Sequence, residues 1–123
     1  MIVGSVNANR EAIIRLLVGA PEGQTQEIEA IIDTGFTGFM SLPPDLIESL
    51  GLAWHGHSQA VLADGGLHLF EVYAARVVWD GQSRTVEIDA ADIELIIGMG
   101  LIYGYELRIQ TVTGGSVTIE RLP

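Results

Sequence analysis

Short runs in which apolar residues alternate with polar ones, or follow one another without a break, predict a chain built mainly of β-strands. Residues 11–19 and 26–32 are rich in Ile, Leu and Val, and the turn signal Pro21-Glu22-Gly23 separates them. They therefore predict a hairpin. Residues 43–50 predict a helix, with two prolines at its start, apolar positions on one face and Gly51 just after its end.

The second half of the chain returns to strands. Residues 59–62 and 67–72 flank Ala63-Asp64-Gly65-Gly66 and predict a second hairpin with an Asp-Gly turn. One or two helical turns are expected at 101–105. The remaining strands are expected at 39–42, 72–79, 85–88, 93–97, 106–112 and 117–119. The predicted fold class is all-β, with one or two short helices.

The length and hydropathy of the chain predict that it associates with another protein chain. The 123 residues fit one domain, spanning 1–123, and leave no room for a second domain of ordinary size. Apolar residues make up 48% of the chain and the mean hydropathy is +0.35. A small domain has much surface for its volume, so this apolar content predicts a face that is buried against another chain.

Charge and cysteine content exclude several classes of function. Six basic residues against sixteen acidic ones give a net charge of −10, which argues against binding to nucleic acid or to an anionic membrane. Without cysteine, disulfides and thiolate sites are excluded. The longest apolar stretch, 93–109, is interrupted by charges and glycines and is too short to span a bilayer. No signal peptide is visible, so a soluble cytoplasmic protein is expected.

One acidic residue stands at an unusual place. The apolar run Ala30-Ile31-Ile32 leads directly into Asp33-Thr34-Gly35. A carboxylate at the end of a buried strand costs free energy unless it is hydrogen-bonded or used in chemistry. Asp33 is therefore the first candidate for a catalytic residue.

Asp33-Thr34-Gly35 after an apolar strand resembles the catalytic motif of aspartic proteases. Ile96-Ile97-Gly98, followed by Leu101-Ile102, resembles the strand that crosses beneath the catalytic loop in that family. Residues 59–72 resemble the flap, with Asp64, Gly65 and Gly66 at its tip. In order and spacing the chain is similar to single-domain retropepsin-like (clan AA) proteases of the prokaryotic type, over roughly residues 11 to 112. The resemblance implies an acid-protease barrel.

The chemistry of such a site requires two carboxylates that share a proton. One takes a proton from the attacking water, while the other donates to the carbonyl oxygen of the peptide bond. The chain contains a single Asp-Thr-Gly, so a complete dyad requires a homodimer in which Asp33 meets Asp33 of a second copy. No cofactor and no metal ion is expected.

The resemblance also implies roles for the neighbouring residues. The Thr34 hydroxyl would hold the two catalytic loops together across the dimer, and Gly35 would let the backbone turn and the substrate approach. The substrate would be a peptide or protein segment in extended conformation, bound as an added strand. The residues expected to contact it are Phe36, Thr37, Asp64, Gly65, Gly66 and Ile96.

The sequence departs from the family pattern at several positions. Phe36 and Thr37 replace a small residue and an acid or serine, and Met99 replaces a frequent arginine. The helix at 43–50 and the C-terminal hairpin are additions relative to the shortest members. Two rival functions stay open: a catalytically silent dimer that binds peptides or serves as a dimerisation module, and a structural dimer whose groove Phe36 closes.

The remaining aromatic and histidine residues have simpler interpretations. His55 and His57 are expected to be solvated loop residues rather than metal ligands, because no third ligand is identifiable. Tyr103 and Tyr105 are expected to serve in packing. Trp79 is a candidate for the core, and Trp54 for the core or a dimer contact.

Overall fold

The computed structural model describes residues 1–61 and 63–123, and they form ten strands and two short helices. This confirms the prediction of an all-β chain with one or two helices. In chain order the elements are β1 (Ile2–Val6), β2 (Ala12–Gly19), β3 (Thr25–Ile32), β4 (Met40–Leu42), α1 (Pro44–Leu50), β5 (Ala53–Val61), β6 (Leu67–Trp79), β7 (Gln82–Ala90), β8 (Ile96–Ile97), α2 (Met99–Ile102), β9 (Tyr105–Ile109) and β10 (Ser116–Arg121).

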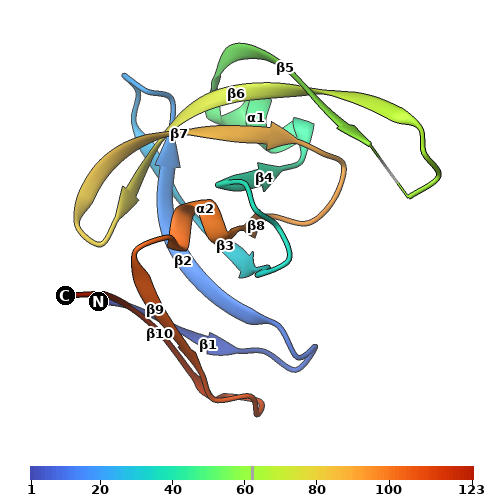
Figure 1. The fold of residues 1–123 in the computed structure, drawn as a ribbon. Helices are drawn as coiled ribbons and strands as arrows, with labels where there is room; N and C mark the ends of the chain where they lie inside the picture. The colour runs from blue at the N-terminus through green and yellow to red at the C-terminus, as the bar shows by residue number, and fades with distance from the viewer. Residues whose placement is uncertain (62) are drawn as a thin grey trace.

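The strands form one strongly bent sheet with the order β5-β6-β7-β4-β8-β3-β2-β1-β10-β9. The far end of β6 also pairs with β2, with Val77 opposite Val18, so the sheet closes on itself. Hairpin β5–β6 projects beyond the rest of the chain at the right of Figure 1. At the other end, β10 lies between β1 and β9, which brings the two termini close together (Figure 1).

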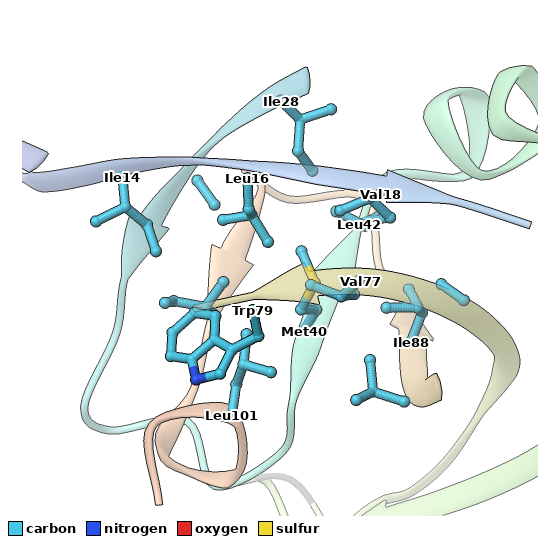
Figure 2. Close-up of a cluster of buried hydrophobic side chains, with 14 of the residues drawn as sticks. Ile14, Leu16, Val18, Ile28, Met40, Leu42, Val77, Trp79, Ile88 and Leu101 are labelled. Atoms are coloured by element: carbon cyan, nitrogen blue, oxygen red, sulfur yellow. The ribbon is translucent and has the colours of Figure 1, made fainter. Parts of the chain in front are cut away.

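The core lies inside this closed sheet. In β2 the alternation seen in the sequence is realised, because Ile14, Leu16 and Val18 are buried while Arg15 and Leu17 are exposed. Figure 2 shows these side chains facing those of β4, β6, β7 and α2. Trp79 is 1% exposed and packs edge-to-face on Tyr105, with ring centroids 5.8 Å apart, which confirms Trp79 as a core residue and Tyr105 as a packing residue.

Strands β1 and β5 differ from what the sequence pattern indicated. Strand β1 was not predicted, because Gly4 interrupts the apolar run. A Cβ at Gly4 would lie 2.0 Å from the Ile13 carbonyl oxygen, so glycine is what lets β1 approach β2. Strand β5 begins at Ala53 rather than at residue 59, which places His55 and His57 in a strand and not in a loop. Both histidines are nevertheless exposed.

The other differences from the sequence prediction concern where elements begin and end and how far two aromatic side chains are exposed. Of the expected strand 93–97 only Ile96–Ile97 pairs, and Ile93 is 53% exposed. The helix expected at 101–105 is α2, which ends at Ile102, and Tyr103 is 84% exposed instead of packed. Trp54 is 59% exposed and is no core residue. Leu62, at the end of the predicted strand 59–62, lies outside the described residues.

In the described part of the chain, both helices are too short for a membrane crossing.

Candidate active site

The loop that carries Asp33 is fixed at both of its ends to the same short strand. Strand β8 lies between β3 and β4, parallel to β3 and antiparallel to β4. Ile96 is paired with Ile31 on one side and with Ser41 on the other. The Asp33 N–H donates to the Ile97 carbonyl at 2.9 Å, which continues the β3–β8 pairing into the loop. Residues 33–39 are therefore held where β3 ends and β4 begins.

Hydrogen bonds inside the loop fix the Asp33 carboxylate. The Gly35 N–H donates to Asp33 Oδ1 at 2.9 Å, and the Phe36 N–H donates to the Asp33 carbonyl at 3.1 Å. Asp33, Thr34 and Gly35 are all exposed. One carboxylate oxygen is thus oriented by the backbone of its own loop, and the group is accessible from outside. This arrangement can present a carboxylate for proton exchange with a bound molecule.

Glycines let the loop lie directly on the segment after β8. A Cβ at Gly98 would lie 2.4 Å from the Gly38 carbonyl oxygen and 2.5 Å from that of Phe36. Three backbone hydrogen bonds join the two segments, from the N–H groups of residues 98, 99 and 100 to the carbonyls of residues 39, 36 and 38, at 2.8–3.0 Å. The Ile96-Ile97-Gly98 motif is therefore brought against the Asp33 loop, as the sequence motif indicated.

Phe36 and Thr37 lie on the same loop but face different surroundings. The Phe36 ring is half-buried and close to two glycines, since a Cβ at Gly38 would lie 2.5 Å from its Cζ and one at Gly98 would lie 2.6 Å from its Cδ2. Thr37 is exposed and borders a shallow pocket of about 490 Å³ that Met99 and Tyr103 also line. Contact of either residue with a substrate stays a prediction.

The predicted flap is the hairpin β5–β6. At its tip, Asp64 Oδ1 accepts a hydrogen bond from the Gly66 N–H at 2.7 Å, and Gly65 has φ of +80°, a conformation that favours glycine. Asp64, Gly65 and Gly66 therefore form a tight turn, with Asp64 and Gly65 exposed and Gly66 half-buried, which agrees with the predicted Asp-Gly turn.

An apolar strip on this hairpin was missed in the sequence. Side chains of a strand alternate between its faces, so Leu67 and Leu69 share the face of β6 that carries Val77 in the core. Val61 is opposite Leu67. These three residues are 62–73% exposed, although they are large and apolar. The spacing of two residues between Leu67 and Leu69 was the available signal.

The histidines pair with carboxylates on the hairpin and its neighbour. His57 Nε2 is 3.1 Å from Glu71 Oε1, and the Trp54 indole donates to the other oxygen of Glu71. His55 Nε2 is 3.7 Å from Glu87 Oε1. Within residues 1–61 and 63–123, no three His, Asp or Glu side chains gather in a way that could hold a metal ion.

A larger pocket of about 510 Å³ opens beside Thr34. Its walls come from three segments that are distant in sequence: the turn between β1 and β2, the end of β3, and residues 109–113. Apolar side chains, among them Ile31, Ile32, Ile109 and Val112, form much of its lining. Thr34 is thus the residue of the Asp-Thr-Gly triplet that borders this pocket.

The comparisons with known proteins rest on structure. No family model matches the sequence, and no curated protein matches it significantly. A retropepsin-like aspartic protease from Rickettsia conorii superposes with a TM-score of 0.65 at 14% identity, over 98% of this chain and 89% of that chain.

Two viral structures are also similar. The EIAV protease, solved with the inhibitor HBY-793, has a TM-score of 0.57 at 16% identity, over 78% of this chain and 88% of its own. The foamy viral protease-reverse transcriptase, solved with an RNA/DNA hybrid, has a TM-score of 0.51 at 19% identity; 76% of this chain matches 12% of that much longer one. The expected fold is confirmed: the chain has the fold of the retropepsin-like aspartic proteases.

Proposed function

We propose that the chain is one half of an aspartic endopeptidase, in which two copies bring Asp33 and the partner's Asp33 together. The observation that carries the proposal is the exposed Asp33 carboxylate, oriented by the Gly35 N–H on a loop clamped to β8, within a fold shared with aspartic proteases. One chain supplies one such carboxylate, so the second must come from another copy.

The two carboxylates share one proton because two negative charges at close range do not both persist. The ionised carboxylate takes a proton from a water molecule, and the oxygen of that water attacks the carbonyl carbon of the peptide bond. The protonated carboxyl donates its proton to the carbonyl oxygen, which gives a neutral tetrahedral intermediate. In the collapse, the carboxyl that took the water proton gives it to the amide nitrogen, the other carboxylate takes a proton from a hydroxyl of the intermediate, and the C–N bond breaks to give a carboxylic acid and an amine.

The substrate is an extended peptide that lies between the Asp33 loop and hairpin β5–β6. The backbone of the peptide would pair with the backbone at the tip of the hairpin, where Gly65 and Gly66 have no side chains to obstruct it. Asp64 would hold the turn at the tip. Phe36, Thr37 and Ile96 would line side-chain subsites on the loop side. Val61, Leu67 and Leu69 favour apolar substrate side chains on the flap side, because they are exposed before any ligand is bound.

Asp33→Asn tests the proposal. The amide oxygen of the new side chain can still accept the Gly35 N–H, so the loop and the fold should be retained. Hydrolysis of a denatured protein or a peptide library should fall by at least about 10³-fold, since the amide can neither accept nor share the proton. Mass spectrometry of the products measures cleavage, and circular dichroism checks the fold.

Asp45→Asn is the matched control, because Asp45 is an exposed aspartate on α1 and should leave activity unchanged. Wild-type turnover in Asp33→Asn would exclude the mechanism. A wild-type protein that binds peptides without cleaving them would favour the catalytically silent dimer instead.

A further inference from the structure

The face of hairpin β5–β6 that carries the exposed apolar side chains changes character toward the base of the hairpin. Leu67, Leu69 and Glu71 follow one another at a spacing of two residues, so their side chains lie on the same face of β6. Two residues of a strand span about 6.8 Å. A peptide that follows this face away from the tip therefore meets a carboxylate directly after the two leucines.

The Glu71 carboxylate is oriented by two neighbours on β5 and stays accessible. The Trp54 indole N–H donates to one of its oxygens, and His57 Nε2, from the residue directly opposite, lies 3.1 Å from the other. A carboxylate has about four acceptor positions, so these two contacts do not exhaust it. The Glu71 side chain is still 45% exposed, and among the described residues no arginine lies within 4.0 Å of it. It can therefore accept a hydrogen bond from a bound molecule.

Trp54 places an aromatic ring beside this carboxylate. The ring is 59% exposed, and it meets the His57 ring edge-to-face at a centroid distance of 5.5 Å. The face of an indole attracts the cation of a lysine or arginine side chain, and a carboxylate forms strong hydrogen bonds with the same cation. Trp54 and Glu71 together thus offer the two kinds of contact that bind a basic side chain.

The charge of the whole chain favours the same kind of ligand. Sixteen acidic residues against six basic ones give −10, so the chain attracts cationic peptides and repels acidic ones. A basic side chain is therefore drawn toward the protein before it reaches Trp54 and Glu71.

We infer that Trp54 and Glu71 select a lysine or arginine side chain of the substrate, two residues beyond the substrate residue that contacts Leu69. The inference rests on the proposed function, in which an extended peptide lies along this hairpin. It adds a substrate class: peptides with an apolar residue near the flap tip, then any residue, then a basic one farther from the tip.

A positional scan of a cleaved peptide tests the inference. In a peptide that the full chain cleaves, each position is replaced in turn by Lys, Gln and Glu, and mass spectrometry gives kcat/KM for each product. At one position the Lys peptide should be cleaved about tenfold faster than the Gln peptide, the factor expected for a half-exposed ion pair with a cation–π contact.

Glu71→Gln should lower this Lys/Gln ratio to about threefold or less. The new amide oxygen can still accept the Trp54 N–H, so the hairpin is retained, and a ratio measured within one variant does not depend on how much of it is folded. Glu71→Lys should reverse the preference, so that the Glu peptide is cleaved faster than the Lys peptide at the same position.

Glu87→Gln is the matched control. Glu87 also lies on a strand near a histidine, with 3.7 Å between its Oε1 and His55 Nε2, and it is 60% exposed. It is opposite Ala74, three residues from Glu71 and hence on the other face of the sheet. Removal of its charge should leave the Lys/Gln ratio within about twofold of wild type.

The outcomes separate the inference from the proposed function. A lysine preference that is equal at all positions, or that Glu71→Gln retains in full, would reflect the charge of the whole chain and overturn the inference. Cleavage that Asp33→Asn abolishes would show in that case that the proposed function survives. A wild-type chain that cleaves no peptide would overturn the proposed function and the inference with it.

Discussion

Substitution of Gly98 by alanine is the most direct test of how the candidate site is held. Gly98 has φ of −116° and ψ of −177°, which any residue adopts, so alanine causes no torsional strain there. Its Cβ would lie 2.4 Å from the Gly38 carbonyl oxygen and 2.5 Å from the Phe36 carbonyl oxygen. Both oxygens would have to retreat by about 0.8–0.9 Å to reach the ~3.3 Å of a close C···O contact.

The two carbonyls are not free to retreat. Phe36 accepts the Met99 N–H at 2.8 Å, and Gly38 accepts the Gly100 N–H at 3.0 Å. Weakening both bonds costs about 1 kcal/mol each. Overpacking adds about 1–3 kcal/mol. The free energy of unfolding should therefore fall by about 3–5 kcal/mol, a large part of the ~5–15 kcal/mol of a typical domain.

Urea unfolding followed by tryptophan fluorescence measures the loss, because Trp79 is buried in the core. Gly23→Ala is the control: its Cβ would meet only the Ala20 Cβ closely, at 3.1 Å, and the free energy of unfolding should change by less than about 1 kcal/mol. Peptide cleavage by Gly98→Ala should also fall, since the displaced loop carries Asp33. A loss of stability below about 1 kcal/mol, with normal cleavage, would show that the loop does not depend on these contacts.

Two further predictions concern stability. Burial, and next to it the charge of Glu87, raises the pKa of Asp89, so the folded protein holds this proton more tightly than the unfolded chain does. The folded state is therefore destabilised as pH rises above the ordinary pKa of aspartate, and Asp89→Asn should stabilise the protein more at pH 7 than at pH 4 in urea unfolding; an equal effect at both pH values would contradict this. The Ser41 hydroxyl is buried without a hydrogen-bond partner among the described residues. Ser41→Ala should therefore raise the free energy of unfolding by about 1 kcal/mol, measured in the same way, and a clear loss of stability would show that the hydroxyl is satisfied.

The sequence was most informative where a local pattern coincides with a local structure. The apolar run before Asp33 is a strand, and Ile96-Ile97-Gly98 lies beside it as predicted. Helix α1 was also recognisable, because its initial prolines and Gly51 mark its ends; Gly51 has the left-handed conformation of a C-cap.

What could not be predicted depends on contacts between distant segments or on strands with two exposed faces. Strand β5 contains Trp54, His55 and His57, and solvent on both sides removes the need for alternation. The pocket beside Thr34 arises only when residues 109–113 fold back on the β1–β2 turn. No local sequence pattern encodes such a contact between distant segments, whereas the exposed leucines of β6 are recognisable in the sequence by their spacing of two residues.

The position of β8 between β3 and β4 has a consequence for how the protein folds. Its partners Ile31 and Ser41 belong to the first third of the chain, while Ile96 and Ile97 come near the end. Contacts between residues so far apart in sequence are entropically costly to form and slow folding. A chain emerging from the ribosome therefore has no ordered aspartate loop until β8 has been synthesised. Since β8 contributes only two residues, the aspartate loop should also be among the first regions to exchange its amide hydrogens.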